Sequence, residues 1–215
     1  MLKLIIPNMH PQGIGQYCAH AEDILAIEKL PWRQDMNTLQ DLQELEAWWV
    51  SKDPWNYEEN GDDEKRKGML LYAIPRKEYR RVLDIGCGNG FITRHLPGRE
   101  IIGVDVSANA IRHARESSRG FPHIQYRQHS IFEMPVQDSS RSFDLIVVTG
   151  VLYPQYIASA EKLIYAIIDE LLMDGGILVS CHIDAWYTSR FPYVTLLREY
   201  YPYRDYNHVL EVYMK

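Results

Sequence analysis

Cysteine, long apolar runs and excess positive charge are all scarce in this sequence of 215 residues. Its three cysteines, Cys18, Cys87 and Cys181, are widely spaced and form no C-x-x-C motif. This argues against a disulfide framework or a zinc site and fits a reducing cytoplasm. No stretch approaches the roughly 20 apolar residues of a membrane-spanning helix, and the N-terminal apolar run is too short for a signal peptide. The net charge of −6 disfavours a nucleic-acid backbone as the main partner. We therefore expect a cytoplasmic protein whose partners include neither membranes nor nucleic acid.

The composition that remains is that of an ordinary globular protein, at 46% hydrophobic and 24% charged residues. The length allows one sizeable domain with an appendage. We expect an N-terminal helical cap over residues 1–60 and a larger domain over 61–215. Apolar spacing predicts cap helices over 20–30 and from Asn37-Thr38 to Trp49, and a further helix over 61–74 that leads into the larger domain.

The most informative stretch is VLDIGCGNG, residues 82–90. A short apolar strand runs into a glycine turn, and residues 91–96 continue with a helical pattern. Glycines allow a tight turn and a close approach of the backbone to a ligand. The spacing is G-x-G-x-G rather than the G-x-G-x-x-G of a dinucleotide site. This spacing, together with the acid before the turn, argues against an NAD-dependent oxidoreductase.

Two acids flank the glycine turn. Asp84 precedes it, and a carboxylate in that place would repel a pyrophosphate but attract an ammonium group. Asp105 ends the next predicted strand, 101–105, where an acid can accept hydrogen bonds from both hydroxyls of a ribose. A site for an ammonium group next to a site for a ribose describes S-adenosylmethionine (SAM).

The rest of the larger domain alternates strands with helices, which predicts an α/β fold. Residues 143–149 read as a buried strand, because their central run, 145–148, is continuously apolar, as expected for a parallel strand covered on both faces. Other strands are predicted over 123–127 and 177–182. Helices are predicted over 107–116, capped by Ser107, over 158–172, closed by Asp174-Gly175-Gly176, and over 189–200. Residues 203–215 are predicted to form two short strands, one of them antiparallel.

Three motifs in order, VLDIGCGNG, GVDVS and FDLIVVTGVLY, make the chain from about residue 80 onward resemble the class I SAM-dependent methyltransferases. The resemblance implies a doubly wound, mostly parallel, seven-stranded Rossmann-like sheet with helices on both faces. It also implies SAM as the cofactor, with S-adenosylhomocysteine as product. Ser130 stands where the family usually has an acid facing the adenine amine, and its hydroxyl can still accept one hydrogen bond. The cofactor contacts expected are Asp84, Gly86, Cys87, Gly88, Asp105, Val106, Ser130, Ile131, Thr149 and Gly150.

A narrower resemblance is to methyltransferases of the nodulation-protein-S type, whose members N-methylate a chitooligosaccharide-type amino sugar. The residues that carry it are Asp53-Pro54-Trp55, Arg66-Lys67, Pro75-Arg76 and Val151-Leu152-Tyr153. It implies transfer to an amine or hydroxyl of a sugar or natural product, with nitrogen ahead of oxygen. Protein methylation remains an open alternative, as does a homodimer.

Four aromatic or basic side chains are candidates for the acceptor side of the site. His182 and Tyr153 follow predicted strands, where His182 could act as a base and Tyr153 could orient the acceptor or hold the methionine end. Both could equally be packing residues. Trp55 and Tyr57 could form a lid over the substrate, or simply attach the cap to the domain. No metal site is predicted, because His182-x-Asp184 supplies only two ligands.

A SAM-binding module without catalysis, acting as a partner of another enzyme, is the alternative from a different class. Ser130 favours this alternative because it departs from the family pattern. Asp84, Asp105 and the glycines oppose it, since a degenerate module would be expected to lose some of them.

Overall fold

The computed structural model describes residues 40–134, 142–188 and 190–215. All of these belong to one compact unit, Asn37–Lys215. The helix predicted over 20–30 and most of the predicted cap lie outside the described residues. The division into domains at residue 60 therefore stays a prediction.

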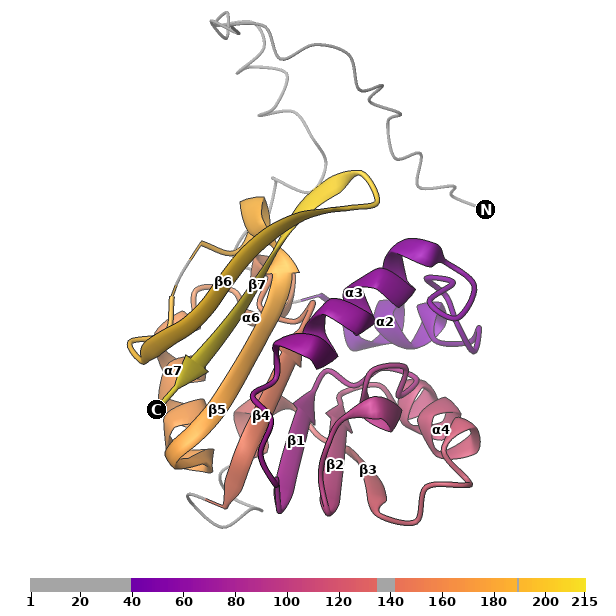
Figure 1. The fold of residues 1–215 in the computed structure, drawn as a ribbon. Helices are drawn as coiled ribbons and strands as arrows, with labels where there is room; N and C mark the ends of the chain where they lie inside the picture. Colours follow the sequence, from indigo (N-terminus) through magenta and orange to yellow (C-terminus); the bar gives the residue numbers. More distant parts are fainter. Residues whose placement is uncertain (1–39, 135–141, 189) are drawn as a thin grey trace, which may run out of the picture. The chain divides into compact units, whose positions relative to one another are not determined.

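A seven-stranded sheet forms the centre of the fold, with the strand order β3-β2-β1-β4-β5-β7-β6 (Figure 1). Five strands are parallel, and β7 runs antiparallel to both of its neighbours, β5 and β6. The predicted fold class, a mostly parallel Rossmann-like sheet, is confirmed. The strands are β1 (Arg81–Ile85), β2 (Glu100–Asp105), β3 (Ile124–Gln128), β4 (Phe143–Thr149), β5 (Leu172–Ile183), β6 (Val194–Tyr203) and β7 (Tyr206–Met214).

Helices cover both faces of this sheet. On one face, α7 buries Ile164, Ile167 and Ile168 against the strands. On the other, α3 buries Leu70, and α4 packs beside it over β2 and β3. The helices are α2 (Leu42–Trp48), α3 (Gly61–Ala73), α4 (Ala108–Ser117), α6 (Pro154–Ile157) and α7 (Glu161–Leu171), with short 3-10 turns η2 (Thr93–His95), η3 (Ile131–Glu133) and η4 (Asp184–Trp186).

Capping residues fix where the helices begin. Asn60 accepts a hydrogen bond from the backbone N–H of Asp62 and starts α3, which ends before Pro75 as the sequence predicts. Ser107 caps α4 in the same way by accepting from Ala110. The α2 helix is capped by Asp41, and the predicted cap Asn37-Thr38 lies outside the described residues.

The predicted helix over 189–200 is wrong. Residues from Val194 onward form β6, which pairs along its length with β7. Its β-branched and aromatic residues suit a strand, and the antiparallel pairing supplies contacts that local helical spacing cannot. The two short strands predicted over 203–215 are one strand, β7, so that β6 and β7 form a hairpin. The sheet edge at β6 tolerates Pro202, since a proline on an edge strand costs little pairing.

Two smaller expectations also differ from the structure. The predicted helix over 91–96 is only the 3-10 turn η2. The helix predicted over 158–172 is α7, which begins only at Glu161, and the short helix α6 precedes it. Asp174-Gly175-Gly176 lies within β5 instead of ending the helix. α7 ends at Leu171 and β5 begins with the next residue, so the glycines shape the start of the strand.

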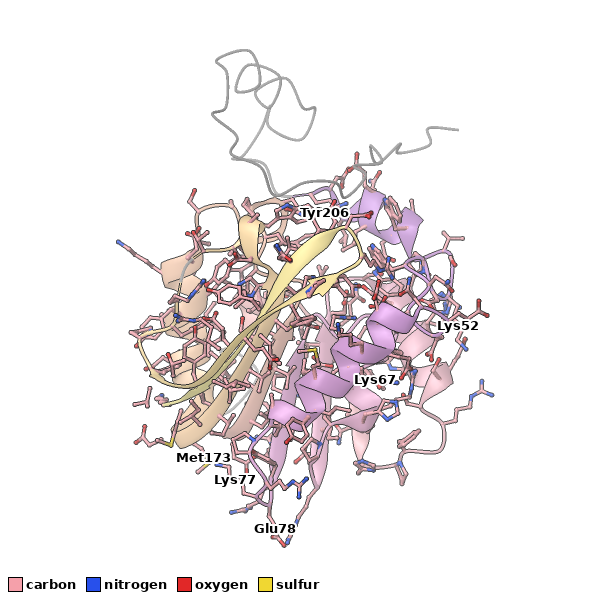
Figure 2. The ribbon with its side chains drawn as sticks, turned by 45° about the horizontal axis from the view of Figure 1, so that its top comes forward. Lys52, Lys67, Lys77, Glu78, Met173 and Tyr206 are labelled. Atoms are coloured by element: carbon pink, nitrogen blue, oxygen red, sulfur yellow. The ribbon has the colours of Figure 1, made fainter. Side chains whose placement is uncertain are left out.

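The carboxyl ends of the parallel strands lie at one edge of the sheet. Figure 2 labels Tyr206 near this edge and Met173, Lys77 and Glu78 near the opposite one. In Figure 1, α3 runs across the sheet, and the tip of the β6–β7 hairpin bends toward its N-terminal end. Ligands of open α/β sheets bind at the carboxyl edge, so the candidate site is expected there.

Candidate cofactor and acceptor site

The glycine turn after β1 is hydrogen-bonded to the backbone of β2. The backbone N–H groups of Gly86 and Cys87 both donate to the carbonyl of Val104, over 2.8 and 3.0 Å. Gly86 has φ of 72°, and a Cβ there would lie 2.0 Å from Cγ2 of Val151. Gly88 and Gly90 also have positive φ. Glycine is therefore required by backbone conformation, and at Gly86 by space as well.

Asp105 is held by the glycine turn itself. One carboxylate oxygen accepts from the N–H of Gly88 (3.0 Å) and the other from the N–H of Ser107 (2.9 Å). Burial raises the pKa of Asp105, although these two hydrogen bonds work in the opposite direction. The carboxylate is thus fixed in orientation at the end of β2, where the sequence predicts a ribose contact.

Asp84, the penultimate residue of β1, is almost completely buried, with 1% of its surface exposed. One carboxylate oxygen accepts a 2.6 Å hydrogen bond from the hydroxyl of Thr93. The other, Oδ1, has no hydrogen-bond partner within the described part of the chain. Burial raises the pKa of Asp84 to about 6. A buried carboxylate with a free oxygen is a site for a positively charged group.

Arg66 is a second buried ion, and it was not among the site residues predicted from the sequence. It projects from α3, is 7% exposed, and pairs with Asp63 over 3.1 Å. Its Nε has no partner among the residues that the structure covers. Asp84 and Arg66 interact electrostatically, and the Arg66 charge works against the raised pKa of Asp84. The signal that could have found Arg66 is the Asp63-x-x-Arg66 spacing, which places an acid and a base on one helix face.

The remaining predicted cofactor contacts follow the same edge. Val106, 37% exposed, comes directly after β2. The hydroxyl of Ser130 accepts from the N–H of Phe132 and caps η3, so this serine already has a structural partner. Ile131 is buried behind it. Thr149 ends β4, and Gly150 follows with φ of 67° and open space where a Cβ would lie.

His182 and Tyr153 both lie at this edge, but their polar atoms are already engaged. The ring nitrogens of His182 contact the hydroxyl of Ser180 (3.2 Å) and the carbonyl of Tyr187 (3.1 Å). Burial lowers the pKa of His182 to about 4. The hydroxyl of Tyr153 accepts the N–H of Ile183 over 2.9 Å. This geometry favours the packing alternative for His182. The O–H of Tyr153 can still donate a hydrogen bond.

Trp55 and Tyr57 belong to a ladder of aromatic rings. Trp55 stacks on Trp48 at 5.9 Å between ring centroids and on Tyr57 at 5.8 Å. Tyr57 stacks in turn on Phe91, just after the glycine turn, at 5.7 Å. The guanidinium of Arg66 lies over the Tyr57 ring at 5.2 Å. The ladder attaches the loop to the domain, and a lid role for its outer rings stays a prediction.

The α2 helix lies against the cofactor edge, a placement that the sequence did not predict. Glu46 accepts hydrogen bonds from the hydroxyl of Ser107 and from the N–H groups of Ala108 and Asn109, at the start of α4. Burial alone would raise the pKa of Glu46, but these bonds outweigh it and lower the pKa. A Cβ on Gly88 would lie 3.0 Å from the ring of Trp49. Helix α2 is therefore fixed to both sides of the turn.

Across residues 40–134, 142–188 and 190–215, no group of three or more histidine, cysteine or acidic side chains could hold a metal ion. Within the same ranges, no helix is both long and apolar enough to cross a membrane.

Comparison with known proteins agrees with this geometry. The family model described as a methyltransferase domain matches residues 76–206, more than half of the chain. The fold resembles the N-methyltransferase NodS from Bradyrhizobium japonicum in complex with S-adenosylhomocysteine, with a TM-score of 0.68, 23% identity, and coverage of 81% of this chain and 97% of that one. The sheet and the fixed acids at its carboxyl edge thus define a SAM-dependent methyltransferase fold. The chain belongs to the methyltransferase-domain family, with SAM as its cofactor.

Curated relatives act on different acceptors. A trans-aconitate 2-methyltransferase from Deinococcus radiodurans is 32% identical over 51% of this chain and 40% of its own length. A tRNA U34 carboxymethyltransferase from Shewanella halifaxensis is 27% identical over 74% of this chain and 44% of its own. The chain spans less than half the length of the curated relatives it matches.

Proposed function

We propose that this protein transfers a methyl group from SAM to a small molecule, most favourably to an amine of a sugar or natural product and secondarily to a hydroxyl. The observation that carries the proposal is a pair of buried, oppositely charged groups. Oδ1 of Asp84 and Nε of Arg66 have no hydrogen-bond partner among the described residues. Together they match the ammonium and carboxylate of an amino acid. The fixed carboxylate of Asp105 beside them matches a ribose. SAM carries all three groups.

Each residue has a definite task in this proposal. Arg66 binds the carboxylate of the methionine end, and Asp84 accepts from its ammonium group. Asp105, held by the glycine turn, accepts from the ribose hydroxyls. When bound, SAM supplies an electrophilic methyl group on a sulfonium, and the enzyme's main contribution is to align the acceptor with it. Tyr153 can orient the acceptor by donating a hydrogen bond to it, because burial raises the pKa of Tyr153 and keeps its hydroxyl protonated.

The state of His182 supports nitrogen ahead of oxygen. A hydroxyl acceptor needs a base with a free lone pair. Both nitrogens of His182 are engaged, and its lowered pKa makes it a weak base. An amine can lose its proton to water before it enters the site and needs no such group. A small acceptor is preferred to tRNA because the net charge is −6.

Calorimetry with S-adenosylhomocysteine tests the cofactor site. We expect binding by the wild type that Asp105→Ala weakens at least about tenfold, as befits the loss of charge-assisted hydrogen bonds. No binding by the wild type would refute the site. Turnover is then measured with matched acceptors, an amino sugar and its N-acetylated form. Methylation of the first alone supports an amine acceptor, and methylation of tRNA alone refutes a small-molecule one. Cofactor binding without turnover on any acceptor would favour the non-catalytic module instead.

A further inference from the structure

Asp63 connects α3 to the opposite end of the chain. Its side chain is completely buried. One oxygen accepts from the hydroxyl of Tyr203 (2.7 Å) and pairs with Arg66 (3.1 Å). The other accepts from Nε and Nη2 of Arg204. Tyr203 ends β6, and Arg204, with φ of 49°, lies in the turn to β7. The hairpin tip thus donates hydrogen bonds to both oxygens of a carboxylate on α3.

The position of Arg66 depends on that carboxylate. Asp63 holds one edge of the guanidinium, and the ring of Tyr57 (5.2 Å) and the ring of Tyr203 (5.5 Å) lie against it. Nε is buried and has no hydrogen-bond partner in the described ranges. Because a guanidinium is planar, fixing its Asp63 edge also fixes the direction in which Nε points. Any rotation of Asp63 would therefore turn Nε as well.

One carboxylate, Asp63, is shared by two guanidinium groups, those of Arg66 and Arg204. Arg66 also interacts electrostatically with the buried carboxylate of Asp84. Nε of Arg66 is buried and has no hydrogen-bond partner in the described ranges, so a bound carboxylate next to it would satisfy this donor.

Arg204 also reaches the aromatic loop. Its Nη2 donates to the carbonyl of Trp55 over 2.7 Å, and its backbone N–H donates to Asp62 over 3.2 Å. One residue at the hairpin tip therefore orients the loop carrying Trp55 and the helix carrying Arg66. This joint attachment is more than is needed to close a hairpin.

We infer that Tyr203 and Arg204 are positioning residues, which hold Asp63 so that Arg66 presents its free edge to the carboxylate of the bound cofactor. The inference rests on the proposed function, and specifically on the role of Arg66. Neither Tyr203 nor Arg204 needs to touch the cofactor. Their effect should consequently be confined to ligands that carry the amino-acid carboxylate.

Two ligands separate positioning from folding. S-adenosylhomocysteine carries the carboxylate, and 5′-methylthioadenosine lacks the amino-acid end. Calorimetry on Tyr203→Phe and Arg204→Ala should show a Kd for the first ligand raised about tenfold, as for a lost hydrogen bond to a charged group. The Kd for the second should change less than about twofold. In steady-state kinetics, KM for SAM should rise while kcat is largely kept, because the contact to the carboxylate is equally strong in the ground state and in the transition state.

Arg198→Gln is the matched control, because Arg198 lies on β6 but binds Glu211 and not Asp63. Its two Kd values should keep the wild-type ratio. Equal weakening of both ligands in Tyr203→Phe would overturn the inference and leave a structural role. Unchanged binding would overturn it too. If Arg204→Ala does not fold, Tyr203→Phe, which removes one oxygen, carries the test alone. No binding of S-adenosylhomocysteine by the wild type would instead refute the proposed function, on which this inference rests.

Discussion

Replacing Asp84 with asparagine should stabilise the ligand-free protein while weakening cofactor binding. The carboxylate is buried, one of its oxygens has no hydrogen-bond partner in the part of the chain that the structure describes, and burial raises its pKa from 3.8 to about 6. A tenfold change in an acid dissociation constant corresponds to about 1.4 kcal/mol, so the ionised form costs about 3 kcal/mol of unfolding free energy at neutral pH. Asparagine removes this cost and can still accept from Thr93. The gain at pH 7 should approach about 3 kcal/mol as an upper bound.

The pH dependence provides the sharper test of this prediction. Between about pH 4 and 6 the folded wild type holds the Asp84 proton and the unfolded chain does not, so wild-type stability from this group falls as pH rises. Below about pH 4 the side chain is neutral in both states, and the advantage of Asp84→Asn should vanish. The advantage should grow through pH 5 and level off above pH 7.

Urea unfolding followed by tryptophan fluorescence at several pH values measures this difference. Asp205→Asn serves as the control, because Asp205 is exposed in the β6–β7 turn and should change stability little. In parallel, Asp84→Asn should raise the Kd for S-adenosylhomocysteine at least about tenfold. A variant that is less stable at pH 7, or a gain that does not vary with pH, would refute the account of Asp84 as a costly buried anion.

Three further predictions concern the turn, the α2 helix and His182. Gly86→Ala and Gly150→Ala both place alanine at positive φ, but only the alanine at position 86 would clash with a neighbour, Val151. Thermal melts should show a stability loss of about 1–2 kcal/mol for Gly150→Ala and clearly more for Gly86→Ala. Equal losses would contradict the steric argument. Glu46→Gln should weaken the attachment of α2 to α4 by about 1 kcal/mol. Hydrogen exchange at the first amides of α4 should then quicken in Glu46→Gln but not in Glu44→Gln, whose side chain is exposed. His182→Ala should cost about 2–3 kcal/mol of stability. The methylation rate of the wild type should nevertheless show no dependence on a histidine titration between pH 6 and 8. A rate that rises over this range in the wild type and not in His182→Ala would restore His182 as the base.

Local patterns in the sequence were sufficient to predict the glycine turn and its two acids. Asp84 and Asp105 each adjoin a short apolar strand, and parallel strands end at the same edge. Their proximity follows from topology without knowledge of side-chain packing. The alternation of strands and helices predicted the α/β class, and the resemblance to class I methyltransferases implied the seven-stranded, mostly parallel sheet; the structure confirms this fold class.

Features that depend on distant partners were not predicted. Asp63 and Arg204 are separated by 141 positions, and neither has a local signature beyond its charge. β6 was mistaken for a helix because its pairing with β7 outweighs its local spacing. The engagement of His182 depends on Tyr187, whose carbonyl is brought back by the turn after β5. In the first two cases the deciding contact joins separate segments of the chain, and for His182 it depends on how the turn after β5 folds. Spacing along one segment reveals neither.

The order of strands has a consequence for how the sheet can be assembled. β7 follows β6 in the chain but lies between β5 and β6. β6 therefore has no place in the sheet until β7 has paired with β5. Loss of β7 would remove two strands at once, and with them the hairpin tip that reaches Asp63. Any event that separates β7 from β5, such as proteolysis or a destabilising change in that strand, should weaken cofactor binding although it changes no residue of the cofactor site.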